Sequence, residues 1–304
     1  MFRKKFFLVL LNVVVLISAC APKVESTSVS PIVPQPTSTS ASATSGDNST
    51  SEEVSSGPIG IIAIGHSGLT AYRTDPNQPD HDAKANSWAT GTNPEINSIY
   101  QRLLAVHPEI TDQVSNMAQG GTEAIELAGQ ARTALQLVPE PELVIIQTID
   151  NDIRCDGTDA DNLKAFGHSV ENALNVIVEA SPNSRILMVS QPGRPAEYAA
   201  ALENNPDAKA VVTGMGMCDL FDPDGKLNQE HVATITAIIE SYEAEQARVC
   251  ATVPQCSTDN GAFATYVDDI TRLVPDDWAH LSAEGQARLA EIIWPVISDL
   301  LELK

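Results

Sequence analysis

The sequence predicts an α/β protein: a three-layer α/β/α sandwich with a central, mostly parallel sheet of about five strands. Two observations lead to this fold class. Short apolar runs rich in β-branched residues recur along the chain, as expected of strands that are buried on both faces. Longer segments with apolar residues at helical spacing lie between them, and this alternation is typical of a parallel sheet covered by helices.

The alternation begins near residue 58 and continues to the C-terminus. Strands are predicted at residues 59–64, 112–118, 142–148, 185–190 and 264–268. Helices are predicted at residues 93–106, 122–137, 160–180, 229–248 and 282–301. The segment 193–224 ends in Pro-Asp-Gly turn chemistry, so we expect an excursion near the active edge of the sheet and not a second domain.

The last helix carries the clearest local signals. Ser282 can cap its free N–H groups, and Glu284 lies in the first turn, where the helix dipole favours a carboxylate. Apolar residues from Leu289 to Leu301 then form one face of the helix. Pro295 removes one backbone donor, so we expect a bend or local break there.

The N-terminal residues are predicted to lie outside the fold. Three basic residues at positions 3–5 precede the apolar run 6–17, which is too short to span a membrane comfortably. The sequence Ile17-Ser18-Ala19-Cys20 resembles the lipobox of bacterial lipoproteins. This resemblance implies cleavage after residue 19, a lipid on Cys20, and an extracytoplasmic protein anchored to a membrane of the bacterial cell envelope. The alternative is a plain secretory peptide that leaves Cys20 as an odd thiol.

The segment 20–57 is rich in Ser, Thr and Pro and has no apolar period. Such a segment buries too little surface to offset its ordering entropy, so a disordered tether is predicted. The globular domain is then expected to span residues 58–304.

The chain is strongly acidic, with 18 Lys and Arg against 40 Asp and Glu and a formal net charge of −22. Because nucleic-acid affinity comes largely from neutralising phosphates, this balance excludes a nucleic-acid partner. It also disfavours electrostatic adhesion to anionic lipid, so the N-terminal lipid is the expected membrane contact. We expect a monomer.

Four cysteines remain in the globular part, and an even number in an exported protein predicts disulfides. Three pairings are possible. Cys250 and Cys256 enclose a short loop, so we prefer this pair together with Cys155 and Cys218. A zinc site is disfavoured because the spacings are irregular and no histidine lies near the cysteines in the sequence.

The strand at 59–64 ends at Gly65 and is followed two residues later by Ser67. A glycine lets the chain turn sharply, so Ser67 is expected at the carboxyl end of a buried strand. Ligands bind at that edge of open α/β sheets. An ordinary strand-to-loop turn would have the same local sequence, so the rest of the chain has to decide the role of Ser67.

A second candidate lies just before the last helix, where Asp277 and His280 are three residues apart. In a tight turn this spacing lets the carboxylate reach the imidazole Nδ1, which leaves Nε2 free to act as a base. Taken alone, the pair would more simply be two loop residues at the entry of a helix.

Four short blocks resemble those of the SGNH, or GDSL-like, hydrolases, in the order of that family. The first is Gly-His-Ser-Gly-Leu at 65–69, and the second is Asn-Met-Ala-Gln-Gly-Gly-Thr at 116–122. The third is Asp-Asn-Asp at 150–152, and the last is Asp-Trp-Ala-His-Leu-Ser at 277–282. The resemblance covers the whole globular part and implies the fold of that family, which is flavodoxin-like.

The resemblance also implies roles for single residues. Ser67 would be the nucleophile, His280 its base and Asp277 the residue that orients the base. The oxyanion would be held by the N–H groups of Ser67 and Gly121 and by the amide of Asn151. Between Gly120 and Gly121, counting from the start of the second block favours Gly121.

Two positions depart from the family pattern. His66 replaces the usual Asp before the nucleophile, and Ile149 replaces the glycine of the third block, which affects the backbone beside Asn151. The α/β-hydrolase alternative fails because its Gly-x-Ser-x-Gly motif would need a glycine where Leu69 stands.

Other polar clusters are interpreted as structural. Asp80, His81 and Asp82 lie in a Pro- and Asn-rich loop, where solvated charge is the simpler reading than a metal site. The acidic residues at 150–161 fail the calcium-loop pattern, and we expect Asp152 to hold the loop that carries Asn151. Trp88 fits equally a substrate subsite and a core anchor. No metal or cofactor is expected.

The predicted function is therefore that of a lipid-anchored serine esterase outside the cytoplasm. It would act on a small ester: an acyl or acetyl group on a carbohydrate, or a lipid ester. The alternative is a cell-surface protein that binds a ligand or carbohydrate on the same fold without turnover.

Overall fold

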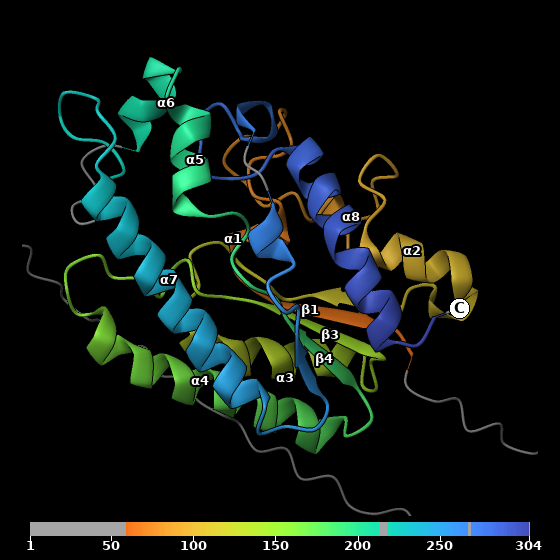
Figure 1. Cartoon of the computed structure of the whole chain (residues 1–304). Coiled ribbons are helices and arrows are strands. Elements are labelled where there is room, and N and C mark those ends of the chain that lie inside the picture. Colours follow the sequence, from red (N-terminus) through yellow and green to blue (C-terminus); the bar gives the residue numbers. More distant parts are fainter. Residues whose placement is uncertain (1–58, 213–217, 267–268, 304) are drawn as a thin grey trace, which may run out of the picture. The chain divides into compact units, whose positions relative to one another are not determined.

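The computed structural model describes residues 59–212, 218–266 and 269–303 (Figure 1). The predicted leader at 1–19, the lipidation site Cys20 and the tether at 20–57 lie outside the described residues. Within the described ranges, no helix combines the length and apolar character that crossing a membrane would need.

A sheet of five parallel strands confirms the predicted fold class. Its order is β2-β1-β3-β4-β5. The strands are β1 (Ile61–Gly65), β2 (Val114–Asn116), β3 (Leu143–Gln147), β4 (Arg185–Met188) and β5 (Cys256–Thr258). The chain adds β2 on one side of β1 and β3 on the other, so the order reverses at β1. Ligand crevices form at such a switch point, outside the carboxyl ends of the strands.

Helices cover both faces of the sheet (Figure 1). Helices α3 (Leu127–Leu137), α4 (Asp159–Ala180) and α7 (Gln229–Cys250) pack on one face, and α2 (Ile99–Val106) and α8 (Ala283–Leu300) pack on the other. Because successive strand residues point to opposite faces, neighbouring residues enter different cores. Ile62 and Ile64 lie in the first core, and Ile61 and Ala63 lie in the second.

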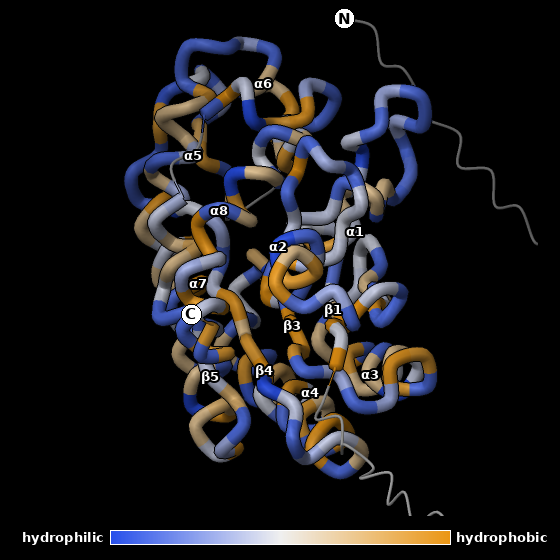
Figure 2. Tube along the Cα trace, turned by 90° about the vertical axis from the view of Figure 1, so that its right-hand side faces the viewer, coloured by the Kyte–Doolittle hydropathy of each residue, from blue (hydrophilic) through white to orange (hydrophobic). Residues whose placement is uncertain are grey.

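Burial on both faces explains why the central strands are almost entirely apolar, with Gln147 as the polar exception. All five residues of β1 and all five of β3 are buried. Figure 2 shows β1, β3 and β4 as largely hydrophobic segments, with hydrophobic and hydrophilic residues mixed along the helices around them. Each buried Ile or Leu side chain contributes about 1.5–3 kcal/mol, so these strands are a major source of stability.

A third, smaller core lies under the excursion at 193–224. Two short helices form there, α5 (Pro195–Leu202) and α6 (Pro206–Val211), and they lie near the start of α7 (Figure 1). Leu202, Leu220 and Leu273 are among the buried residues of this core. The excursion is therefore a packed addition to the sandwich.

The last strand, predicted at 264–268, is wrong for residues 264–266, and residues 267 and 268 lie outside the described ranges. Residues 263–265 form a 3-10 turn, in which Phe263 is buried against the second core. The last strand is instead β5, a polar three-residue segment that pairs with β4 at the edge of the sheet. A strand this short and only partly buried has no apolar run that would reveal it in the sequence.

Two predicted helices begin later than expected. The helix predicted at 93–106 begins at Ile99, where Ser98 and Gln101 form a reciprocal capping box. The first turn of the helix predicted at 122–137 is a 3-10 turn at 124–126, and the α-helix follows from Leu127. The last helix is capped by Ser282, which accepts from the N–H of Gly285, and it continues through Pro295.

Two disulfides join the four cysteines in the preferred pairing, Cys155 with Cys218 and Cys250 with Cys256. The first connects the loop before α4 to the excursion at 193–224. The second closes the short connection between α7 and β5. Disulfides of this kind are typical of proteins in oxidising compartments outside the cytoplasm.

Candidate active site

The turn after β1 depends on the absence of a side chain at Gly65. Its φ is +142°, and a Cβ placed there would lie 1.8 Å from the carbonyl oxygen of Gln147 in the neighbouring strand β3. Only glycine allows this close approach. The chain then turns into the short helix α1 (Ser67–Thr70), which His66 caps by accepting from the N–H of Gly68 at 3.1 Å. Ser67 is thereby placed at the carboxyl end of the central strand.

Ser67, His280 and Asp277 form a continuous chain of hydrogen bonds. The Oγ of Ser67 lies 3.0 Å from Nε2 of His280, and Nδ1 of the same ring lies 2.8 Å from Oδ2 of Asp277. These residues come from opposite ends of the domain, with 213 positions between Ser67 and His280. The carboxylate fixes one ring nitrogen as the donor, so the other can accept the proton of the serine hydroxyl.

The turn between Asp277 and His280 holds the carboxylate in place. Its Oδ1 accepts from the backbone N–H groups of Ala279 and His280, both at 3.0 Å. Burial raises the pKa of Asp277, but the hydrogen bonds from the His280 side chain and from these two N–H groups lower it more, and the net pKa lies well below its ordinary value. Asp277 is therefore ionised throughout the neutral and mildly acidic range.

The depressed pKa of Asp277 also links the site to folding. A carboxylate with a lower pKa in the folded state than in the unfolded state contributes stability above the unfolded pKa, about 4. That contribution disappears as the pH falls through the folded value, which is lower still. Neutral conditions thus favour both the ionised site and the folded domain.

Arg73 contacts Asp277, one of the hydrogen-bonded residues, in a way that the sequence does not indicate. Its Nη1 donates to Oδ2 of Asp277 at 3.2 Å, and its Nη2 donates to Asp80 at 2.6 Å. The ring of Tyr72 contacts the ring of His280 edge-on at 5.0 Å. No sequence signal connects Arg73 to Asp277, because 204 positions separate them and only the fold brings them together.

The predicted oxyanion residues approach Ser67 from two loops. A Cβ placed on Gly120 would lie 3.9 Å from Cβ of Ser67, whereas one placed on Gly121, whose φ is +78°, would have no atom within 4 Å. By this measure Gly120 is the glycine that lies nearer to Ser67, whereas counting along the sequence favours Gly121. Asn151 lines the same cavity as Ser67. Which glycine donates to an oxyanion stays a prediction.

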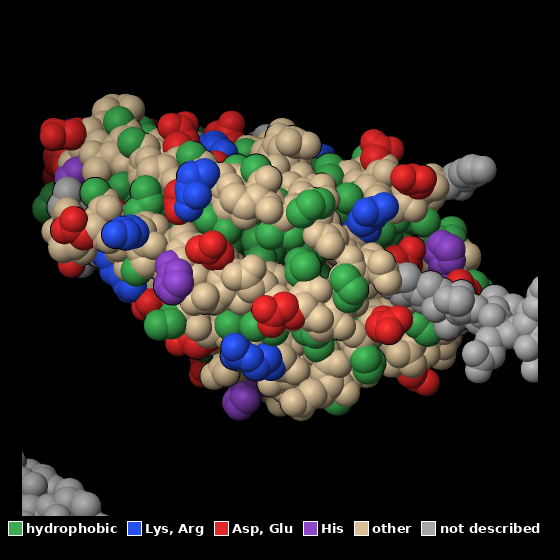
Figure 3. All heavy atoms as spheres, turned by 90° about the horizontal axis from the view of Figure 1, so that it is seen from below, with side chains coloured by type: hydrophobic (Ala, Val, Ile, Leu, Met, Phe, Trp, Pro, Cys, Tyr) green, Lys and Arg blue, Asp and Glu red, His purple; other side chains and the backbone are tan. Residues whose placement is uncertain are grey.

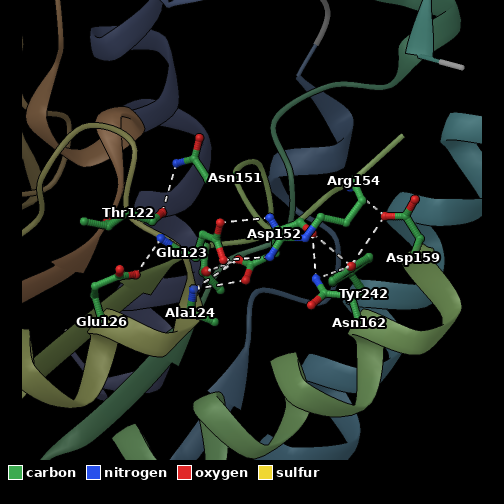
Figure 4. A network of polar contacts seen from close by, with 11 residues as sticks. Thr122, Glu123, Ala124, Glu126, Asn151, Asp152, Arg154, Asp159, Asn162 and Tyr242 are labelled. Atoms are coloured by element: carbon green, nitrogen blue, oxygen red, sulfur yellow. Dashed lines mark hydrogen bonds and ion pairs between the residues drawn. The ribbon is translucent and has the colours of Figure 1, made fainter. Parts of the chain in front are cut away.

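The two loops are tied to each other by buried hydrogen bonds (Figure 4). The side-chain amide of Asn151 donates to the carbonyl of Thr122 at 2.9 Å, and the carboxylate of Asp152 accepts from the N–H of Ala124 at 3.1 Å. Burial raises the pKa of Asp152 more than the hydrogen bonds from the Ala124 N–H and the Thr148 hydroxyl lower it. As expected, Asp152 fastens the loop that carries Asn151.

Ile149 has a positive φ, a backbone conformation that favours glycine, and glycine is the residue at this position in the family whose motifs the sequence resembles. Its φ is +95°, which is unfavourable for a β-branched residue by about 1–3 kcal/mol. The side chain is fully buried in the first core, and this burial offsets the strain. Ile149 therefore occupies a conformation that favours glycine, and the burial of its side chain stabilises it there.

The remaining polar candidates have structural roles. Trp88 is fully buried and donates from Nε1 to Gln147 at 3.1 Å, which makes it a core anchor and not a subsite. Asp82 accepts from the hydroxyl of Thr70 at 2.6 Å, and Asp80 pairs with Arg73. Among the described residues, no group of three or more acidic, His or Cys side chains is arranged to hold a metal ion.

A cavity of about 440 Å³ opens beside Ser67 and His280. Near these residues its lining is polar, with Gln147, Asp150 and Asn151. Its other lining residues are largely apolar and include Pro195 of α5, Ile235 and Ile239 of α7, and Val212 and Leu220. This size is in the range of small-molecule sites.

Charged side chains are mixed on the outer surface seen in Figure 3. Lys and Arg are scattered among Asp and Glu on this face. The described residues there form no continuous basic stripe of the kind that nucleic-acid binding requires. The exclusion of a nucleic-acid partner, which rests on net charge, stays a prediction.

Comparison with known proteins gives similarity to solved structures only. No family model matches the chain. No curated protein sequence matches it either. A structure described as a GDSL-like lipase from Parabacteroides merdae is 12% identical, with a TM-score of 0.47, and the alignment covers 82% of this chain and 97% of that one.

Two further structures are similar at the same level. The extracellular lipase of Streptomyces rimosus is 15% identical, with a TM-score of 0.47 and coverage of 80% of this chain and 99% of that one. A family two carbohydrate esterase from Cellvibrio japonicus is 12% identical, with a TM-score of 0.47 and coverage of 81% and 62%. Values this low do not transfer an activity, so a function has to be argued from the geometry of the site.

Proposed function

We propose that this protein is a serine hydrolase that cleaves carboxylic esters outside the cytoplasm. The observation that carries the proposal is the continuous hydrogen-bond chain from Asp277 through His280 to Ser67, which ends at the mouth of a cavity. A serine hydroxyl is a weak nucleophile until a base takes its proton. Here the base lies within hydrogen-bond distance and is itself oriented by an ionised carboxylate.

In the first half of the reaction, Ser67 Oγ attacks the ester carbonyl carbon while its proton moves to Nε2 of His280. The carbonyl oxygen becomes negative and needs donors. Ser67 is the first residue of α1, so its N–H has no acceptor within that helix. Together with a glycine N–H at 120–121 and the amide of Asn151, it would hold this oxygen, and each such donor is typically worth about 3 kcal/mol.

In the second half, His280 returns the proton to the alcohol oxygen, and the alcohol leaves. Water then attacks the acyl group on Ser67, again with His280 as the base, and the acid product is released. Asp277 stays ionised throughout and stabilises the imidazolium. No step in this sequence requires a group from outside the chain other than ester and water.

The proposal includes anchoring by a lipid on Cys20, followed by a tether at 20–57. The lipobox-like sequence supports the anchor, and the two disulfides support a location in an oxidising compartment. The lipid would keep the domain at the membrane while the tether lets it reach substrates around it.

A fluorophosphonate reagent tests the proposed nucleophile directly. Oγ of Ser67 is expected to form a P–O bond as the P–F bond breaks, which releases fluoride and transfers the serine proton to His280. We expect one phosphonyl group per chain on the peptide that contains Ser67, with parallel loss of p-nitrophenyl butyrate hydrolysis. Labelling of another residue would contradict the assignment, and absence of hydrolysis with every ester would favour a binding protein.

Arg73 gives a prediction for the pH dependence of this reaction. Its cation lies 3.2 Å from Oδ2 of Asp277, where it opposes protonation of the Asp277–His280 pair. Without this cation, in Arg73→Met, the Asp277–His280 pair should be protonated at higher pH. The acidic limb of the kcat/KM profile should therefore move to higher pH, by roughly half a pH unit at this partly exposed position. The measurement is the pH profile of p-nitrophenyl butyrate hydrolysis.

Two matched variants accompany this prediction. Arg73→Lys keeps the charge and should leave the limb near its wild-type position. Arg248→Met removes the same charge at an exposed ion pair with Glu245 on α7 and should not move it. An unmoved limb in Arg73→Met would refute the electrostatic role of Arg73.

A further inference from the structure

Much of the lining of the cavity beside Ser67 is apolar, and we call this part the chamber. Val212, Leu220, Ile235, Ile239, Leu273 and Leu281 line it. Ile235 and Leu281 are only partly buried although they are apolar and lie among core residues. Apolar side chains that are left partly uncovered inside a concave site are typical of a surface that an apolar ligand covers.

The Arg194 cation in the lining is already paired with a carboxylate. Both guanidinium nitrogens of Arg194 contact the carboxylate of Glu243, at 2.8 and 3.2 Å. Asp150 lies 3.5 Å from Nε2 of His66. Among the described lining residues, Arg194 is the one Lys or Arg, and its pairing leaves no cation for a phosphate or carboxylate. The chamber therefore suits an uncharged, apolar group.

Within the proposed serine hydrolase, on which this inference rests, we propose that the chamber holds the acyl chain of a medium-length ester of about eight carbons. Each carbon of an acyl chain occupies about the same volume as one water molecule in the liquid, roughly 30 Å³. Eight carbons therefore fill about 240 Å³. That is somewhat more than half of the 440 Å³ cavity and leaves room for the reacting ester. An acetyl group would leave most of the chamber empty.

The geometry of the reaction favours the acyl part over the alcohol as occupant. The acyl carbon stays bound to Ser67 through both halves of the reaction, next to Asn151, which lines the same cavity. The alcohol has to leave and water has to enter, which requires an open side. We place that side at Gly120, because a Cβ placed there would lie 3.9 Å from Ser67 Cβ and 3.7 Å from the carboxylate of the exposed Asp82.

The outer wall of the chamber is fastened to the reacting residues. Cys218 lines the chamber and is bonded to Cys155, four residues after Asn151. Tyr198 of α5 lines it too, and its hydroxyl donates to the carbonyl of Trp278, between Asp277 and His280. The wall and the reacting groups are therefore held together as one unit, which gives the chamber a defined depth.

Hydrolysis of p-nitrophenyl esters by the full chain tests the proposal. Each added methylene that enters an apolar site should raise kcat/KM about three- to fourfold, so we expect octanoate to exceed acetate by at least about 100-fold. Beyond about ten carbons kcat/KM should stop rising, because the chamber is full. A second series, acetate esters of alcohols of increasing length, should show little dependence on length.

A variant that fills the chamber tests its location. In Ile235→Trp the ratio of kcat/KM for octanoate to that for acetate should fall at least tenfold. Ala237→Trp adds the same side chain at an exposed position of the same helix and should leave this ratio unchanged. Thermal melting of both variants shows whether each is folded, and the ratio within one preparation does not depend on the folded fraction.

The outcomes separate the two proposals. Hydrolysis of acetate that depends on Ser67, with no preference for longer acyl chains, would overturn the acyl chamber and leave the serine hydrolase standing. A length dependence in the alcohol series instead of the acyl series, or an unchanged ratio in Ile235→Trp, would also overturn it. Absence of hydrolysis with every ester would overturn both.

Discussion

Replacement of Ser67 by alanine is expected to lower kcat for ester hydrolysis by about 10⁴- to 10⁶-fold. The hydroxyl oxygen is the atom that forms the acyl-enzyme, and its removal leaves His280 without a proton to take. The oxyanion donors and the cavity remain, so KM should change little and weak residual hydrolysis by water should persist. Steady-state kinetics with p-nitrophenyl butyrate or octanoate measure both constants.

Two variants calibrate this result. Asp277→Asn should lower kcat by about 10⁴-fold, because the amide no longer fixes the His280 tautomer or stabilises the imidazolium. Ser241→Ala removes a hydroxyl that bonds only within α7, at Ile238, and should keep full activity. If Ser67→Ala retained most of the wild-type kcat, the assignment of the nucleophile would be wrong.

Replacement of Gly65 by alanine is expected to destabilise the domain by about 4 kcal/mol or more. The added Cβ would lie 1.8 Å from the carbonyl oxygen of Gln147, and a φ of +142° is strained for any residue with a side chain. The obstacle is backbone of the neighbouring central strand, which cannot move without separating β1 from β3. Chemical denaturation, with the free energy of unfolding extrapolated to water, measures the loss.

A second glycine provides the matched control. Gly129 is an exposed residue of α3, and a Cβ placed there meets no atom within 4 Å. Gly129→Ala should therefore stabilise the domain by about 0.5–1 kcal/mol, because alanine loses less backbone freedom in a helix. If both substitutions changed the free energy of unfolding equally, the close approach of β1 and β3 at Gly65 would not be the cause of the predicted destabilisation.

The fold class could be predicted because burial on both faces leaves a strong trace in the sequence. The runs that became β1, β3 and β4 are apolar at every position that enters the two cores, and the long helices α4, α7 and α8 carry continuous apolar faces. The edge strand β5 left no such trace, since Cys256, Ser257 and Thr258 are only partly buried. Its place was therefore assigned wrongly to 264–268.

Helix starts were less predictable than helix faces. The start at Ile99 depends on the capping box of Ser98 and Gln101, whereas apolar spacing alone extends the predicted helix back to residue 93. The first turn at 124–126 is 3-10 and was included in a helix, because apolar periodicity does not distinguish the two geometries over three residues.

For the candidate site, the sequence by itself determined which residues can do the chemistry and in which order they come. Each local pattern is ambiguous by itself: a glycine that ends a strand, a serine two positions later, and a carboxylate three residues before a histidine at a helix entry. The resemblance of four blocks, in the order of one family, is what selects these residues as candidates. The pairing of the cysteines also followed from short-range geometry for Cys250 and Cys256, and by elimination for Cys155 and Cys218.

Tertiary structure alone decided what surrounds these residues. Three features join segments far apart in the chain: the contact of Arg73 with Asp277, the burial of Trp88, and the chamber lined by residues of α5 and α7 together with Val212 and Leu220. Such contacts produce no periodic pattern in the sequence. Each residue is compatible with its own helix, strand or loop, and its contact partner depends on how the other elements pack. The physical reason is that a strand or helix is specified by neighbours in sequence, whereas a cavity is specified by the space that several elements fail to fill.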